Sequence, residues 1–485
     1  MDKQNQNSSM PEDIYPLHIL DDTKLYRFFV SGLMHFNDVL DTKKLHNALS
    51  KLLEIGDWRK LGGRLRIKRN GKLEIHVPRP FTAKQPAVAF THDIFDMTIE
   101  KHPVACRFPK PTDGPSTQPI SSDFQSFVMR PDHPTTIEEM IRQDVPQLSL
   151  HITSFSDATL VALTWPHTMM DAAGHQALLH AWSSVLAGQE EEVPLVLGAH
   201  KDILEDVSSN YDGDQEEFGP DRMRMRGMGK LKFMFQYLWE EFWNSPRETR
   251  VIFLPRNIFV RLQKRIRAEV AESAHTSDQK SFVSDGDILA AWATRAVAST
   301  MPKPRPITIV SFVNARFRLP PLIESRGIYL QNMVLAGYAF LSAHLARGPV
   351  GPIALSHRRH LDEQGTEQQT FSLLKTVRQD IESDGSPNVF YGEPHASLMI
   401  VNNLTKLGII KAANFGPAVL SQGDKEESRS NPPGTMVTVQ NYFHPVSGGP
   451  NLFCILGKDY GGNYWLQGCL LPRVWEIIEK ELEDM

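Results

Sequence analysis

Cysteine is scarce in this chain of 485 residues, which contains three: Cys106, Cys454 and Cys469. Their number is odd and no two have the C-x-x-C spacing, so the sequence offers neither a disulfide framework nor a structural zinc site. Free thiols of this kind are typical of proteins that stay in a reducing compartment. We therefore expect a cytoplasmic protein without a bound metal.

Long apolar runs and blocks of like charge are also missing. No stretch approaches the ~20 consecutive apolar residues of a membrane-spanning helix, and no apolar core of a signal peptide follows the polar N-terminus. The 52 Lys and Arg residues against 57 Asp and Glu give a net charge of −5. This balance, without a basic block, argues against nucleic acid as a partner. We expect a monomer with no transmembrane segment.

The length predicts two domains, because a single core rarely grows to this size. Composition changes most clearly at residues 189–247, which open with an acidic run. We interpret residues 1–188 as the N-terminal domain, 189–247 as an interdomain linker and 248–485 as the C-terminal domain.

Two further segments carry structural predictions. Phe108–Ser122 is rich in Pro, Ser and Thr and is expected to form a surface loop. Lys230–Asn244, inside the linker, is rich in aromatic residues and predicted to be helical. We expect its aromatic stripe to pack on the body of the protein or to line an apolar substrate entrance. A helix lying on a membrane surface is a less favoured alternative, because such helices carry more basic residues on their polar face.

The most informative stretch is Leu148–Gly188. Its first half predicts two strands that turn at Ser156-Asp157, the second deeply buried. Apolar residues then recur at helical spacing until Gly188. His167 falls at the junction between the second strand and this helix. A side chain there can face a cavity while both elements hold it rigid, as a general base requires.

The pattern H-x-x-x-D occurs three times, beginning at His18, His92 and His167. Only the pair His167 and Asp171 has the strand, turn and helix around it. An imidazole that titrates near pH ~6.5 is largely a free base at neutral pH. Asp171 is either a second catalytic group or, as we favour, a residue that caps the helix and pairs with an arginine elsewhere.

Metal binding is an alternative interpretation of the same residues. His167, Asp171 and His175 are spaced at i, i+4 and i+8, which would align them on one face of a continuous helix. Pro166 and the end of the strand place His167 outside the regular helix. We therefore expect no metal site.

With His167 in this setting, the chain resembles the BAHD superfamily of acyl-CoA-dependent acyltransferases, especially its fungal branch in secondary metabolism. The resemblance covers nearly the whole chain and depends on several segments in the expected order. In addition to the His167 stretch, these are residues 57–78 (DWRKLGGRLRIKRNGKLEIHVP), 283–299 (VSDGDILAAWATRAVAS), 313–334 (VNARFRLPPLIESRGIYLQNMV) and 457–482 (GKDYGGNYWLQGCLLPRVWEIIEKEL).

The second family signature, D-F-G-W-G, corresponds here to NFGPA at residues 414–418. Phe415 and Gly416 match the signature, whereas Asn414 replaces an aspartate and can form a hydrogen bond but no ion pair. Pro417 replaces the tryptophan and removes its indole donor, so any oxyanion stabilisation by that group must come from elsewhere. The resemblance also implies that a segment near 411–435 crosses back to the N-terminal domain.

The resemblance implies an α/β fold of two similar chloramphenicol-acetyltransferase-like domains. Each has a mixed sheet flanked by helices, and the active-site channel lies at their interface. His167 would be the general base that deprotonates the acceptor as it attacks the thioester of acyl-CoA, with acetyl-CoA as the default co-substrate. No tightly bound cofactor is implied. A covalent acyl-enzyme is not expected, because the sequence contains no G-x-S-x-G motif.

The resemblance also gives roles to residues far from His167. Arg316 corresponds to the arginine that pairs with the motif aspartate, here Asp171, and a guanidinium can bind a carboxylate through two parallel hydrogen bonds. For coenzyme A we expect contacts from Ser284 and Asn332, and we group Asn414 and Gly416 with them. Ser284 could equally be a plain helix N-cap.

The acceptor is a hydroxyl or an amine, and the sequence does not distinguish them. Apolar character near Phe36, Met170 and Tyr329 favours a hydrophobic small molecule, such as a secondary metabolite. Two other interpretations stay open. A condensation-type domain of peptide synthesis shares the two-domain plan, but such domains usually have H-H-x-x-x-D-G. A non-catalytic BAHD-like protein that only binds a ligand is suggested by the altered NFGPA segment.

Overall fold

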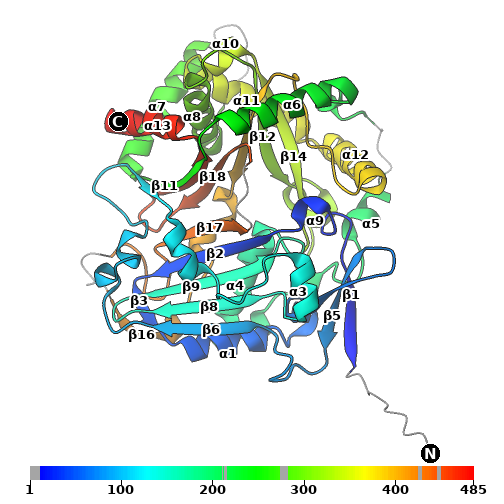
Figure 1. Ribbon diagram of the computed structural model, residues 1–485, viewed down its shortest axis with the longest axis vertical. Coiled ribbons are helices and arrows are strands. Elements are labelled where there is room, and N and C mark those ends of the chain that lie inside the picture. The colour runs from blue at the N-terminus through cyan, green and yellow to red at the C-terminus, as the bar shows by residue number, and fades with distance from the viewer. Residues whose placement is uncertain (1–10, 210, 212–215, 274–281, 424–428, 445–448) are drawn as a thin grey trace, which may run out of the picture.

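Two large sheets form the centre of the protein. The computed structural model describes residues 11–209, 211, 216–273, 282–423, 429–444 and 449–485. The lower sheet in Figure 1 has five strands in the order β17 (Thr438–His444), β2 (Phe29–Phe36), β9 (Thr159–Pro166), β8 (Ser149–Ser154) and β6 (Ala89–Ile94).

The upper sheet has seven strands and its own core. Their order is β14 (Val334–Leu341), β12 (Ile307–Asn314), β15 (Ser397–Asn403), β18 (Asn451–Lys458), β19 (Tyr464–Leu470), β11 (Glu248–Leu254) and β7 (Ser116–Pro119). Both sheets are mixed, because β6 pairs parallel with β8, and β15 pairs parallel with both β12 and β18. The α/β architecture with mixed sheets is therefore confirmed.

Helices cover the sheets and bury their apolar faces. On the lower sheet, α1 (Thr42–Leu52) and α4 (Ala172–Leu186) pack on one face and α2 (Gln125–Val128) on the other. On the upper sheet the buried apolar residues come from α7 (Arg256–Ser273), α8 (Asp285–Ser299), α11 (Val350–Gln364) and α13 (Pro472–Glu483). The remaining helices are α3 (Ile137–Gln143), α5 (Ile203–Ser209), α6 (Gly227–Trp243), α9 (Pro320–Ile323), α10 (Ala343–Ala346) and α12 (Glu367–Asp384).

Three small sheets complete the described strands. They join β1 (Glu12–Pro16), β5 (Leu73–Pro78) and β4 (Arg64–Ile67), then β10 (Val196–Leu197) and β13 (Ile328–Tyr329), and finally β16 (Val419–Gln422) and β3 (Asp38–Leu40).

Each large sheet takes an edge strand from the other half of the chain. From the C-terminal half, β17 pairs antiparallel with β2 of the lower sheet, and β16 pairs with β3 beside it. From the N-terminal half, β7 pairs with β11 of the upper sheet. The sheets therefore do not coincide with the ranges 1–188 and 248–485, and that division of the chain stays a proposal.

Two local predictions need correction, and one stays a proposal. Phe108–Ser122 is not only a loop, because it contains β7, whose backbone finds hydrogen-bonding partners on β11. The segment 189–247 contains β10, α5 and α6, and its role as an interdomain linker stays a proposal. The aromatic stripe of α6 does not pack on the body, because only Phe233 of this helix is buried.

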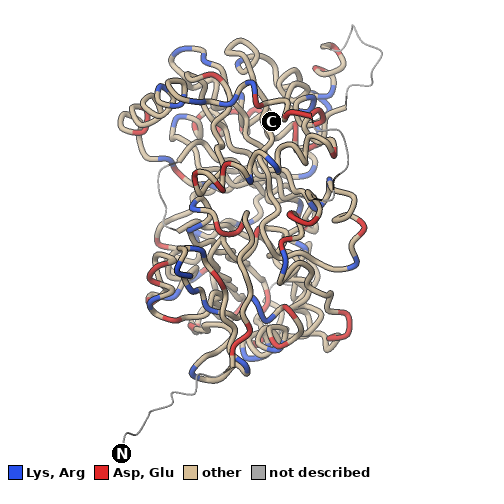
Figure 2. The backbone as a smooth tube through the Cα atoms, turned by 90° about the vertical axis from the view of Figure 1, so that its right-hand side faces the viewer, with Lys and Arg blue, Asp and Glu red and all other residues tan. Residues whose placement is uncertain are grey.

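The distribution of charge along the chain and the length of the helices are relevant to the partners that the protein can bind. Figure 2 shows Lys and Arg interspersed with Asp and Glu along the chain, without one large region of a single sign. Within the described part of the chain, no helix combines the length and the apolar character needed to cross a membrane.

Candidate active site

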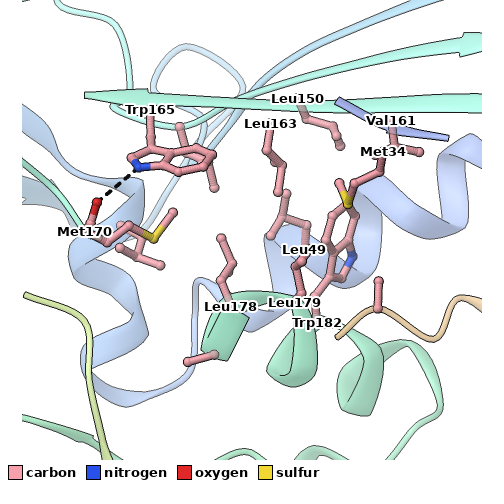
Figure 3. Close-up of a cluster of buried hydrophobic side chains, with 14 of the residues drawn as sticks. Met34, Leu49, Leu150, Val161, Leu163, Trp165, Met170, Leu178, Leu179 and Trp182 are labelled. Atoms are coloured by element: carbon pink, nitrogen blue, oxygen red, sulfur yellow. Dashed lines mark hydrogen bonds between the residues drawn. The ribbon is translucent and has the colours of Figure 1, made fainter. Parts of the chain in front are cut away.

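The loop that carries His167 is held between a buried strand and a buried helix. As the sequence predicted, β9 ends at Pro166, and α4 begins at Ala172. Figure 3 shows the apolar side chains that pack these two elements together, among them Leu163, Leu178 and Trp182. The indole of Trp165 donates to the carbonyl of Met170 at 3.2 Å, which closes the loop across its base. The position of His167 is thus fixed by packing on both sides.

Strand pairing places a second segment beside His167. Because β2 runs antiparallel to β9, with Phe29 opposite Pro166, the residues before β2 lie next to the residue after β9. The backbone N–H of His167 donates to the carbonyl of Phe28 at 2.8 Å. The imidazole stacks on the ring of Tyr26, with centroids 4.5 Å apart and planes 12° apart. Sequence reasoning missed Tyr26 and Phe28, since this pairing is non-local.

Burial and nearby polar groups shift the pKa of the imidazole. Burial lowers the pKa of His167, and its own carbonyl, the charge of Asp171 and the side chain of Asn332 oppose this shift. The ring is therefore neutral at physiological pH and has a lone pair free to accept a proton. Burial also raises the pKa of Tyr26, with added effects from Asp171 and Asp21, so its phenol stays protonated.

Asp171 is buried and engaged in four hydrogen bonds. Its Oδ1 accepts from the N–H groups of Ala173 at 3.0 Å and Gly174 at 3.1 Å, which makes it the N-cap of α4. Its Oδ2 accepts from the N–H of Met333 at 3.0 Å and from Arg316 at 2.7 Å. A carboxylate with both oxygens occupied in this way holds a loop in place.

Arg316 forms the expected ion pair with Asp171, but not the two parallel hydrogen bonds. Only Nη1 reaches the carboxylate. The other nitrogen, Nη2, donates to the carbonyls of Tyr329, at 2.9 Å, and Gln331. The guanidinium is thus shared between the His167 loop of the lower part and the backbone that leads into β14. The second oxygen of Asp171 also accepts a hydrogen bond from Met333. The carboxylate is therefore not available for a bidentate pair with Arg316.

Asn332 connects the His167 loop to Asp21. Its side chain is fully buried, and its Nδ2 donates to the carbonyl of His167 at 2.8 Å and to Asp21 Oδ1 at 2.9 Å. The N–H of Asn332 also donates to Asp21, at 2.8 Å. Asn332 thus ties the His167 loop to a buried carboxylate. The contact of Asn332 with coenzyme A stays a prediction.

Asp21 is a third residue of the site that the sequence did not reveal, after Tyr26 and Phe28. It is buried, which raises its pKa, while the positive charge of Lys60 lowers it. Lys60 is buried as well. Asp21 follows His18 in a segment that contains an H-x-x-x-D pattern, yet its role depends on contact with Asn332, 311 positions away. No local signal predicts such a contact.

Ser284 is the N-cap of α8 and forms a capping box. Its hydroxyl accepts from the N–H of Asp287 at 3.2 Å, and Asp287 Oδ2 accepts from the N–H of Ser284 at 2.8 Å. This is the plain structural alternative named above. The residue is only half-buried, and its contact with coenzyme A stays a prediction.

The NFGPA segment docks on the lower half of the protein. The N–H of Asn414 donates to the hydroxyl of Ser183 in α4 at 2.9 Å, and Asn414 Oδ1 accepts from the N–H of Gly416 at 3.1 Å. Phe415 is fully buried and packs against Trp182 and Phe36. Asn414 thus stabilises a turn that inserts Phe415 into the core. Its role toward coenzyme A, like that of Gly416, stays a prediction.

The three residues of the metal alternative do not converge. His175 is buried against Trp165, and burial lowers its pKa to about 3. In the described part of the chain no group of three His, Cys, Asp or Glu side chains could hold a metal ion.

The residues used to infer a hydrophobic acceptor also need correction. Phe36, Met170 and Tyr329 are buried in the core and cannot line a substrate site. Aromatic surface near His167 comes instead from Tyr26 and Phe28, which are half-buried. Phe443, which is exposed, packs edge-on against Phe28.

Comparison with known proteins agrees with this architecture. No protein-family model matches the chain. The acetyltransferase pyiB of Pyricularia grisea is 35% identical over 484 residues, covering 98% of this chain and 94% of that protein. The O-acetyltransferase PaAT-2 of Phomopsis amygdali is 33% identical over 491 residues, covering 99% of each. The structure of F. graminearum TRI101, complexed with coenzyme A and T-2 mycotoxin, has a TM-score of 0.66 at 13% identity and covers 97% of this chain and 98% of that one. The chain therefore belongs to the fungal branch of the BAHD acyl-CoA-dependent acyltransferases.

Proposed function

We propose that this protein transfers an acyl group, by default acetyl, from acyl-CoA to a hydroxyl or amine of a hydrophobic small molecule. The observation that carries the proposal is the neutral His167 imidazole at the end of β9, stacked on Tyr26, in a loop that Asp171 and Asn332 hold in place. Relatives named acetyltransferases and a fold shared with a coenzyme A complex support it.

The reaction would proceed without a covalent intermediate on the protein. Nδ1 of His167 is buried, so we assign Nε2 as the base. It accepts the proton of the acceptor as the oxygen or nitrogen attacks the thioester carbonyl. The resulting tetrahedral oxyanion collapses, the C–S bond breaks, and the proton on His167 passes to the leaving thiolate. General-base catalysis of this kind is worth ~10²- to 10⁴-fold in rate.

The surroundings of His167 support a hydrophobic acceptor. Tyr26, Phe28 and Phe443 present aromatic surface on one side of the loop. An apolar ring system would bury area against them, worth roughly 25 cal/mol per Å². We propose a secondary metabolite as the acceptor, and Ser284, Asn332, Asn414 and Gly416 as the residues on the side of the coenzyme. The working form would be a cytoplasmic monomer.

Replacement of His167 tests the proposal directly. His167→Ala should lower acyl transfer at saturating acetyl-CoA by about 10² or more, because the variant lacks the base. Transfer is measured as release of free thiol with a panel of hydrophobic alcohols and amines. His92→Ala is the matched control, since His92 has the same H-x-x-x-D spacing outside the site. Turnover of His167→Ala close to that of the control would refute the role of His167.

The same variant separates an enzyme from a protein that only binds a ligand. Coenzyme A and acetyl-CoA should raise the unfolding temperature of both the wild type and His167→Ala, because a ligand at a hundredfold excess over Kd stabilises the folded state by ~2.7 kcal/mol. A thermal shift without transfer by the wild type, for every acceptor tested, would favour the non-catalytic alternative. No shift with any acyl-CoA would contradict both.

A further inference from the structure

Helix α6 has the reverse of the usual polarity of a surface helix. Its apolar side chains recur every three or four residues on one face, as in a helix that packs on a core. This face points to solvent, with side chains from 56% to 78% exposed. They are Met228, Leu231, Phe235, Leu238, Trp239, Phe242 and Trp243. We call these seven residues the α6 stripe. Soluble proteins rarely expose a continuous apolar patch of this kind without a partner.

The face of α6 toward the protein is the more polar one. Glu240 pairs with Arg305, and Glu241 pairs with Arg247 at 2.6 Å, so both carboxylates of the helix are neutralised by the body. Only Phe233 is buried. In Figure 1 this helix, drawn in green, lies in the upper half of the molecule. The polar anchoring fixes the α6 stripe in its outward orientation.

Positively charged side chains lie beside the α6 stripe. Lys232 is exposed on the helix itself. A cavity of about 410 Å³ lies alongside, lined by Trp239 and Trp243 and, from the body, by the exposed Lys303 and Arg473. With the two glutamates already paired, these cations are complementary to anionic groups. Aromatic side chains bordered by lysine and arginine are typical of helices that lie in the interface of a membrane.

We propose that α6 is a docking helix that binds the surface of a bilayer containing anionic lipids. The α6 stripe enters the interface between headgroups and acyl chains, while Lys232, Lys303 and Arg473 contact the headgroups. This inference is independent of the proposed chemistry at His167, because it depends on α6 alone.

Two tryptophans make the contact measurable. Of the eight tryptophans of the chain, six are at most 3% exposed, and only Trp239 and Trp243 are accessible. The full-length protein is mixed with vesicles of phosphatidylcholine alone, or of phosphatidylcholine with phosphatidylserine, and bound protein is separated by sedimentation. Brominated lipids in the same vesicles should quench the fluorescence of these two residues.

We expect at least about tenfold more binding to the anionic vesicles, with a loss at high salt. Phe235→Ser combined with Phe242→Ser should lower the partition coefficient by about a hundredfold, since two large apolar side chains no longer insert. Lys232→Glu with Lys303→Glu should remove the preference for anionic vesicles. Ile67→Ser with Ile94→Ser, two exposed isoleucines on other elements, is the matched control and should bind as the wild type does.

Three results would overturn the proposal. The first is no binding of the wild type to either vesicle. The second is equal loss of binding in the phenylalanine and isoleucine variants. The third is wild-type self-association, measured by light scattering, that the phenylalanine variant abolishes without lipid binding by the wild type, because a second copy of the chain would then cover the α6 stripe. Near-equal unfolding temperatures show that the variants remain folded.

Discussion

At the scale of single residues, Asp171 connects several segments of the chain through its hydrogen bonds. Each of its oxygens accepts two hydrogen bonds, from the start of α4 on one side and from Arg316 and Met333 on the other. These contacts join α4 to the backbone before β14. The same carboxylate contributes a negative charge that opposes the lowered pKa of His167. These contacts support the proposed orienting role of Asp171, which would act through the position and the electrostatics of His167.

Asp171 and Arg316 should behave as a coupled pair. The side chains are 3% and 10% exposed, so Asp171→Ala or Arg316→Ala alone leaves one buried charge uncompensated and should cost about 3–5 kcal/mol of stability. The double variant should recover part of that loss. Denaturant unfolding of the four proteins measures the coupling. Simple addition of the two single losses would mean that the groups do not interact.

At the scale of elements, the segment that returns to the lower half depends on two glycines in contact. Gly434 has a φ of +75°, and a Cβ built there would lie 2.2 Å from the backbone nitrogen of Gly416. The carbonyl of Gly434 accepts from the N–H of Phe415 at 2.7 Å. The close approach of these backbones is what seats Phe415 in the core.

Gly434→Ala should therefore destabilise the protein by about 2–3 kcal/mol, because alanine is strained at this φ and its methyl group meets rigid backbone. Gly114→Ala is the control, since a Cβ there meets nothing within 4 Å and φ is not positive. That variant should stay within about 0.5 kcal/mol of the wild type. Thermal unfolding compares the two, and equal stabilities would contradict the tight packing at Gly434.

At the scale of the whole molecule, buried histidines make stability depend on pH. Burial lowers the pKa of His133 and of His444 to about 4 and that of His175 to about 3. These pKa values of the folded protein lie below the value of ~6.5 that histidine has in the unfolded chain. At intermediate pH the unfolded chain therefore binds protons that the folded protein excludes. The stabilisation from these neutral histidines is complete above pH ~6.5 and is lost as the pH falls toward 4.

We expect each of the three histidines to remove about 1.4 kcal/mol of stability per pH unit over this range. His444→Gln should reduce the slope by about 1.4 kcal/mol per pH unit, because this group no longer titrates. Urea unfolding at a series of pH values from 8 to 5 gives the slope. The loss of stability should begin near pH ~6.5. A stability that stays constant down to pH 5, or an unchanged slope in the variant, would contradict the buried neutral histidines.

Local patterns in the sequence were sufficient to predict the structure of the segment around His167. Alternating and continuous apolar residues predicted β8 and β9, the helical spacing predicted α4, and Pro166 placed His167 between them. Each of these signals arises from residues close together in the chain. The resemblance to the family also depended on such segments and on their order.

Only the tertiary structure decided what surrounds His167 and which way the helices face. Tyr26 reaches it because β2 pairs with β9, and Asp21 because Asn332 connects them. The pairing of β7 with the upper sheet and the outward orientation of the α6 stripe were likewise beyond the sequence. Hydrophobic periodicity reveals that a helix has an apolar face. It does not reveal whether that face meets the core, since burial depends on partners far away in the chain.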